Sequence, residues 1–190
     1  TSVKGLGASI GIAIGSSYIY ENEINFESPT SISFEVAKSN LIKRFKKQIE
    51  SFKSKDRIDE AEVLDAYILI LEDPEITSQF DENSDISTEK VFEVFSSTAS
   101  IFDSMEDDYF KQRSEDIISV GKHLIFAMQD KDTSTSFEEN TILIANDLTP
   151  ADTSSMDLNK VSGIILKEGG FTSHAVIVAK NLGIPCVIGL

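Results

Sequence analysis

The chain has 190 residues, of which 41% are hydrophobic and 26% are charged, as is usual for a globular protein with a substantial core. Its formal charge of −15 argues against nucleic acid as a partner, because a phosphate backbone would be repelled. The longest apolar runs are far too short to span a bilayer, and the N-terminus lacks a signal-peptide pattern, so we expect a cytoplasmic protein without membrane insertion.

The first elements are predicted to be strands and turns over residues 6–20. Gly7, Gly11 and Gly15 separate the apolar residues of this stretch. The glycines recur at every fourth position rather than as GxGxxG, and no helical pattern follows them. Tight turns therefore explain these glycines better than a dinucleotide-binding loop does.

From about residue 34 the apolar residues follow a helical period, which predicts four amphipathic helices. The first runs from about 34 to 52, the second ends before Pro74, the third covers 88–102 and the fourth covers about 104–129. The expected inner faces are Phe34, Leu41, Phe45, Ile49 and Phe52; Val63, Leu64, Ile68 and Leu71; Val91, Phe92, Phe95, Thr98, Ala99 and Phe102; and Met105, Tyr109, Ile117, Val120, Leu124, Ile125 and Met128. Such helices form a small bundle, with His123 expected at a helix surface or interface.

Charge is distributed unevenly along these helices. Residues 38–57 hold eight basic side chains against two acidic ones, which we interpret as a solvated helix face. Residues 72–116 hold fourteen acidic side chains against three basic ones. A surface of that sign would attract a partner with a basic patch and raise its association rate.

Strand patterns return after the polar stretch 130–140, which we interpret as a linker. They cover 141–145, 161–166 and 185–189, with a Thr-Pro turn after the first of them. Strand signals at both ends with helices between them predict an α/β domain formed by residues 1–21 and 140–190, interrupted by a helical bundle over 22–139.

The segment 169–177 carries the most specific pattern in the chain. Gly169 and Gly170 allow a tight turn, Thr172 or Ser173 can cap a helix, and His174 then falls on its first turn. Gly183 and Pro185 are predicted to end this helix. Unpaired N–H groups and the helix dipole would stabilise an anion there, so a phosphoryl group on the His174 ring is one interpretation, and an incidental histidine is the other.

The sequence gives no support for a metal site. It contains two histidines far apart and one cysteine, Cys186, without clustered ligand spacing. We therefore expect no metal or cofactor in this chain, no internal disulfide, and a buried, inert Cys186 thiol.

Several motifs together resemble Enzyme I of the bacterial phosphoenolpyruvate-dependent sugar phosphotransferase system, in its N-terminal part. Their order and spacing match over most of the chain. They are the opening Gly7–Ala13, which resembles GASPGIA; Ile70–Pro74, which resembles a helical LEDP segment; Asp107–Tyr109 with Arg113, Asp116 and Gly121, which resemble the long fourth helix; Asp147–Thr153, which resembles DLTPSET; and Gly169–His174, which resembles the phosphohistidine motif.

The resemblance implies an α/β phosphohistidine swivelling domain interrupted by an inserted four-helix bundle. It implies that His174 is the phosphorylated residue, that Thr153 contacts its ring, and that Thr172, Ser173, Gly169 and Gly170 support the site. The bundle would dock the phosphocarrier protein HPr, which receives the phosphoryl group from His174. Candidate docking residues are Glu72, Asp73, Tyr67, Tyr109 and Arg113.

In the family, phosphoenolpyruvate and Mg²⁺ bind a separate C-terminal barrel that also dimerises. We therefore expect the full-length enzyme to be a homodimer that takes its phosphoryl group from phosphoenolpyruvate, and this chain to be a monomeric fragment without that barrel. Three positions depart from the pattern: Ile10 stands at a usual proline, Tyr67 at a frequent histidine, and Phe171 at a frequently basic position.

Two other interpretations remain. One is the swivelling phosphohistidine domain of a pyruvate phosphate dikinase or phosphoenolpyruvate synthase, which shares the Gly-Gly-x-Thr-Ser-His motif but lacks helices such as those predicted over 34–129. The other is a non-catalytic HPr-docking or regulatory module in which His174 acts as a signalling switch.

Overall fold

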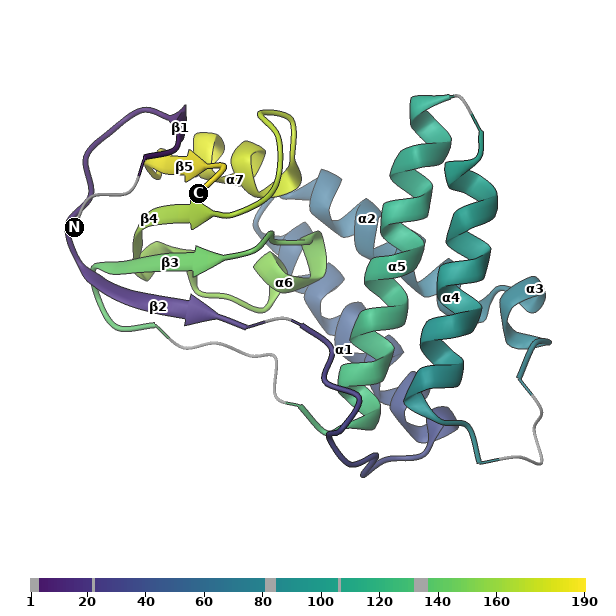
Figure 1. Cartoon of the computed structure of the whole chain (residues 1–190). Coiled ribbons are helices and arrows are strands. Elements are labelled where there is room, and N and C mark those ends of the chain that lie inside the picture. The colour runs from purple at the N-terminus through teal and green to yellow at the C-terminus, as the bar shows by residue number, and fades with distance from the viewer. Residues whose placement is uncertain (1–3, 22, 81–84, 106, 132–136) are drawn as a thin grey trace. The chain divides into compact units, whose positions relative to one another are not determined.

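A computed structural model describes residues 4–21, 23–80, 85–105, 107–131 and 137–190 (Figure 1). The chain forms two compact units, one from Thr1–Glu23 with Ser134–Leu190 and one from Ile24–Thr133. The first is an α/β unit and the second is the helical bundle inserted into it, so the predicted fold class is confirmed.

The unit boundaries differ somewhat from the expected ones at 21–22 and 139–140. Phe137 explains the difference at the second crossing, because it is buried in the core of the α/β unit. Its ring packs edge-on against Tyr18, with 5.3 Å between centroids. The polar stretch 130–140 therefore includes a core residue and is more than a linker.

The bundle contains four long helices: α1 (Phe34–Ser54), α2 (Ile58–Glu72), α4 (Thr88–Asp103) and α5 (Asp108–Met128). A short helix that the sequence analysis did not predict, α3 (Pro74–Thr77), follows α2. Pro74 stands in its first turn, where a missing N–H costs nothing, and the Asp73 side chain accepts from Glu75 N at 2.8 Å. Pro74 therefore ends α2 by starting another helix.

The predicted inner face of α1 is correct, since all five of its residues are buried. Two residues assigned to the inner faces of the later helices are wrong: Phe92 is 42% exposed and Met105 is 38% exposed, whereas Val94 is buried in α4. The Phe92 ring instead packs at 5.4 Å against Phe26, at the margin of the bundle. The helical period correctly located the buried face of each helix. Which residues lie at the margin of that face depends on the segments packed beside it, such as the one that contains Phe26.

The contact between α4 and α5 requires a residue without a side chain. A Cβ at Gly121 of α5 would lie 2.7 Å from the Cβ of Phe95 in α4, closer than real Cβ atoms approach. Gly121 therefore lets the two helices come together over the Phe95 side chain, despite the unfavourable helix propensity of glycine.

The α/β unit is built on a sheet of order β1-β5-β4-β3-β2 in the described residues. Its strands are β1 (Leu6–Ser9), β2 (Ser16–Tyr20), β3 (Thr141–Ala145), β4 (Val161–Leu166) and β5 (Cys186–Ile188). β2, β3, β4 and β5 are parallel, as their arrows show in Figure 1, and β1 pairs antiparallel with β5. The unit also contains α6 (Pro150–Ser154), a 3₁₀ turn η1 (Leu158–Lys160) and α7 (His174–Leu182).

We predict that Phe95→Ala lowers the free energy of unfolding of the bundle by about 3–5 kcal/mol, because this ring is 2% exposed and its removal leaves a cavity. Phe92→Ala, on the same helix, should cost less than about half as much. Urea unfolding followed by circular dichroism measures both. Equal losses would contradict the burial of Phe95 against Gly121.

Candidate functional site

The candidate site is formed by two loops that leave neighbouring strands. β3 is followed by residues 146–149 and α6, and β4 is followed by residues 167–173 and α7. The strands are adjacent and parallel, so both loops start from the same edge of the sheet, where ligand sites of α/β sheets lie. Backbone bonds from Lys167 N to Ala145 O (3.0 Å) and from Glu168 N to Asn146 O (2.8 Å) continue the pairing beyond the strands.

The two glycines of the loop after β4 have different roles. Gly169 has φ +97°, a conformation that residues with side chains rarely adopt, and a Cβ there would lie 3.3 Å from Ser173 Oγ. A Cβ at Gly170 would meet no atom within 4 Å. Only Gly169 is therefore required by the geometry of the loop.

Helix α7 begins and ends where the sequence predicted. Ser173 is its N-cap residue and His174 is its first residue. Gly183 follows the last turn in the left-handed conformation, with φ +67°, and Ile184 and Pro185 lead into β5. His174 is half-buried at the positive end of the helix.

The structure brings Thr153 against His174. Thr153 Oγ1 of α6 lies 2.9 Å from Nε2 of the imidazole, a hydrogen-bond distance between residues 21 positions apart. The same hydroxyl lies 3.1 Å from Pro150 O and 3.3 Å from Thr149 O. A hydroxyl has one proton, so donation to a carbonyl leaves its oxygen to accept from an Nε2–H group.

Two neighbours of His174 have different surroundings. Thr172 is exposed, and Ser173 makes no side-chain capping bond, so the expected cap is present in backbone conformation only. Ser173 Oγ is buried and has no hydrogen-bond partner in the described part of the chain, which costs about 1–3 kcal/mol for such a group. Lys180 Nζ donates to Phe171 O at 3.4 Å, which brings one cation to this loop.

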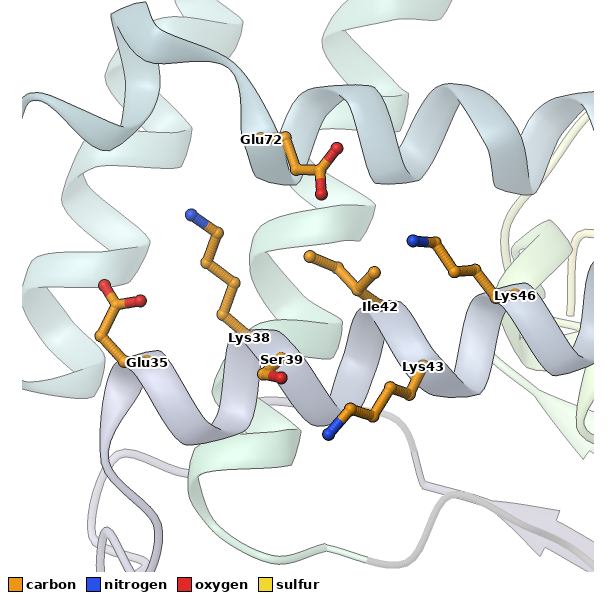
Figure 2. A pocket seen from close by; sticks show the side chains of 7 residues that line it. All are labelled: Glu35, Lys38, Ser39, Ile42, Lys43, Lys46 and Glu72. Atoms are coloured by element: carbon orange, nitrogen blue, oxygen red, sulfur yellow. The ribbon is translucent and has the colours of Figure 1, made fainter.

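Glu72, an expected docking residue, borders a shallow hollow of ≈ 300 Å³ on the bundle. Its other walls come from α1: Glu35, Lys38, Ser39, Ile42, Lys43 and Lys46. Figure 2 shows Lys38 and Lys46 extending towards α2 while Lys43 points away from it. Glu72 is exposed but shares its surroundings with lysines, so this part of the bundle is mixed in charge rather than purely acidic.

Tyr67 is not a surface residue, which corrects its assignment as a docking residue. It is 1% exposed, packs edge-on against Phe45 at 6.0 Å, and its hydroxyl hydrogen-bonds Asp116. Burial of Asp116 raises the pKa of its carboxyl, and the nearby Arg113, 3.6 Å away, opposes that rise. Tyr67 and Asp116 thus form a polar contact inside the bundle.

The remaining docking candidates differ in accessibility. Arg113 is half-buried, and Asp73 is half-buried with its side chain capping α3. The side chain of Tyr109 lies outside the described residues. His123 is 1% exposed between the rings of Phe45 and Phe126, which makes it an interface histidine and not a surface one.

Burial raises the pKa of the Cys186 thiol to about 11, which keeps it protonated and unreactive near neutral pH. Within the described ranges, no three His, Cys, Asp or Glu side chains are grouped as metal ligands. Among the helices that can be described, none has the length and apolar character needed to cross a membrane.

Helix α6 and the residues that hold it were not predicted from the sequence. Thr149 and Asp152 form a capping box in which each side chain accepts from the other residue's backbone N–H. The spacing Thr-Pro-x-Asp, with proline at the first helical position, is the signal that indicates such a helix start.

The fold is an α/β domain with an inserted helical bundle, and comparison with known proteins gives the family. Residues 4–113 match the family described as PEP-utilising enzyme, N-terminal, and residues 137–190 match PEP-utilising enzyme, mobile domain. The chain belongs to the PEP-utilising enzymes and corresponds to their N-terminal part.

Individual relatives agree with this assignment. The chain is 31% identical to a phosphoenolpyruvate-protein phosphotransferase of Staphylococcus aureus, with 98% of the chain and 35% of that protein covered. It is 31% identical to the protein of that name from Mycoplasma genitalium, covering 99% of the chain and 36% of the relative. A solution structure of Enzyme I matches with a TM-score of 0.75 and 30% identity, covering 100% of this chain and 83% of that one. The chain thus spans about a third of the curated relatives' length.

We predict that the neutral His174 ring is protonated on Nε2, because the Thr153 hydroxyl has backbone carbonyls to which it can donate. Nitrogen-15 NMR of the ring reports the tautomer. Thr153→Val should shift the tautomer equilibrium towards Nδ1–H, and Thr153→Ser should retain the Nε2–H form. An unchanged ring spectrum in Thr153→Val would show that the contact does not set the tautomer.

We also predict that the Asp116 carboxyl makes the free energy of unfolding depend on pH. Its folded pKa is raised above the ordinary value of 3.8, so between the two pKa values the folded state binds more protons than the unfolded state. The free energy of unfolding should therefore fall as the pH rises through this window, and Asp116→Asn should remove that slope. Urea unfolding of the wild type and of Asp116→Asn, in steps of about half a pH unit from about pH 3.5 upward, measures this slope. If the free energies of unfolding of the two proteins vary with pH in the same way, Asp116 does not cause the dependence.

Proposed function

We propose that this chain is the phosphoryl-carrying part of a phosphoenolpyruvate-protein phosphotransferase of the sugar phosphotransferase system, and that His174 carries the phosphoryl group. The observation that supports this most directly is the position of His174, first residue of α7, with its ring held by Thr153 at 2.9 Å. Similarity to proteins of that name over 98% of the chain agrees with it.

The proposed chemistry is nucleophilic. A lone pair on an imidazole nitrogen of neutral His174 forms an N–P bond while the bond from phosphorus to the donor breaks and its electron pair leaves with the donor. The reverse step delivers the group to a histidine of HPr. Most of the catalysis is positioning and electrostatic stabilisation, because phosphoryl transfer asks little covalent work of other side chains.

Several groups of this chain would stabilise the charge. The first-turn N–H groups of α7 and the positive end of its dipole favour a dianion on its first residue. The Ser173 hydroxyl is buried and can donate to a phosphoryl oxygen, which would satisfy it. The residue at the frequently basic position, Phe171, contributes no charge, while Lys180 brings one to the same loop through the Phe171 carbonyl.

HPr is the proposed recipient, and the helical bundle is its proposed docking platform. Exposed Glu72 and the half-buried residues Asp73 and Arg113 are the accessible candidates among the described side chains. The lysines beside Glu72 give that surface both signs of charge. The docking residues of HPr would then have to match a mixed pattern rather than an acidic one.

Phosphoenolpyruvate and Mg²⁺ are proposed to act in the whole protein, in a region outside these residues. The described part of this chain offers no grouped acidic ligands for the ion. In this proposal the chain receives its phosphoryl group from elsewhere in the whole protein, and that protein is a dimer.

The test is phosphorylation of the chain by phosphorylated HPr, run in reverse of the physiological direction. We predict an acid-labile label in the wild type and none in His174→Ala, while Asn181→Ala, an exposed change on the same helix, retains it. Trypsin separates the two histidines into peptides 123–131 and 168–180, so mass spectrometry at neutral pH locates the label. Label on 123–131, or on His174→Ala, would refute the proposal.

A further inference from the structure

We propose that Tyr20 and Asp152 are positioning residues that hold Thr153 against His174 and so set the orientation of the ring. This inference rests on the proposed function of His174 for its catalytic consequence. The structural part can be tested in the unphosphorylated protein. It follows from a continuous set of hydrogen bonds that links β2 to the His174 ring.

The set is centred on a buried carboxyl group. Asp152 is 1% exposed, and both of its oxygens accept hydrogen bonds. Oδ1 accepts from the Tyr20 hydroxyl at 2.8 Å, and Oδ2 accepts from Thr149 N at 2.9 Å and from Thr149 Oγ1 at 2.8 Å. Burying a carboxyl group costs free energy unless its oxygens accept hydrogen bonds. Loss of any one of these donors would therefore leave an Asp152 oxygen less well satisfied.

These bonds give α6 a fixed position that the helix could not maintain alone. It has five residues, far below the length at which an isolated helix is stable in water. The reciprocal Thr149 and Asp152 bonds close its N-terminus, and Thr153 N donates to Thr149 O at 3.0 Å in the same turn. The orientation of α6 is therefore determined by the Asp152 carboxyl group and its partners.

Thr153 follows Asp152 directly and is 3% exposed. Its hydroxyl lies 3.1 Å from Pro150 O and 3.3 Å from Thr149 O, which ties it to the same turn. It meets His174 Nε2 at 2.9 Å. A displacement of about 1 Å in a reacting group can cost about a hundredfold in rate. We therefore expect that loss of the Asp152 bonds changes the position of the imidazole through Thr153.

Tyr20 gives this arrangement a reference point in the sheet. It is the last residue of β2, is 8% exposed, and pairs with Ala145, the last residue of β3. Its hydroxyl spans 132 positions of sequence to reach Asp152. One hydroxyl therefore connects the first segment of the discontinuous α/β unit to the helix that holds Thr153.

The test uses the whole chain in two matched pairs of variants. Tyr20→Phe removes only the hydroxyl, and Tyr18→Phe does the same to the half-exposed tyrosine on the same strand. Thr149→Val breaks the capping box, and Thr149→Ser keeps its hydroxyl. Each protein is examined by nitrogen-15 NMR of the His174 ring across pH, by thermal unfolding, and by the rate of labelling from phosphorylated HPr.

We expect Tyr20→Phe and Thr149→Val to shift the tautomer population of the His174 ring and to slow labelling at least about tenfold at temperatures where they are folded. Tyr18→Phe should match the wild type, and Thr149→Ser should restore the ring signal. A lower melting temperature with unchanged ring signal and labelling rate would overturn the proposal, because the bonds would then serve stability alone.

The two proposals fail in different ways. If the wild type takes no label, the proposed function is wrong, but the NMR comparison of unphosphorylated variants still decides whether Tyr20 and Asp152 orient the ring. If the wild type is labelled on His174 and the four variants show the same ring spectrum, the proposed function stands and the positioning inference is wrong.

Discussion

The hydrogen bond between Thr153 and His174 depends on one constraint, the parallel adjacency of β3 and β4. Parallel neighbours end at the same edge of a sheet, so the loops that follow them begin side by side whatever their sequences. Continued backbone pairing through Lys167 and Glu168 keeps these loops together beyond the strands. The 2.9 Å distance between Thr153 Oγ1 and His174 Nε2 then follows from the positions at which α6 and α7 begin. Neither helix needs to be stable in isolation to maintain it.

Local signals were strong enough to predict α7 from the sequence. Gly169, Ser173, Gly183 and Pro185 each act within one turn of their own position. The structure shows the expected turn and stop, and Ser173 at the N-cap position without a side-chain capping bond. Helix α6 could not be found by periodicity, because five residues contain too little of a helical period to distinguish from a turn. The position of Thr153 came from resemblance, since no local pattern relates it to His174.

In the bundle, the sequence predicted the four long helices and the inner face of α1, but it misassigned some side chains of the later helices. The helical period identifies a stripe, whereas its width depends on what lies beside the helix, as Phe92 shows by packing at the margin against Phe26. Tyr67 shows the opposite case. The family resemblance suggested Tyr67 as a docking residue, but Asp116 satisfies its hydroxyl inside the bundle. That pairing between α2 and α5 cannot be read from either helix alone.

The discontinuity of the α/β unit has a physical reason in its sheet. β2 and β3 are parallel neighbours, and parallel strands cannot be joined by a tight turn because the chain must return to the starting edge. The inserted bundle provides that return, so the helical unit occupies a connection that the topology requires in any case. The Tyr20 hydroxyl donates to Asp152, which follows the inserted bundle in the sequence. The position of α6 therefore depends on the register between β2 and β3. Assembly of the sheet from both segments of the chain is therefore the condition for presenting Thr153 to His174.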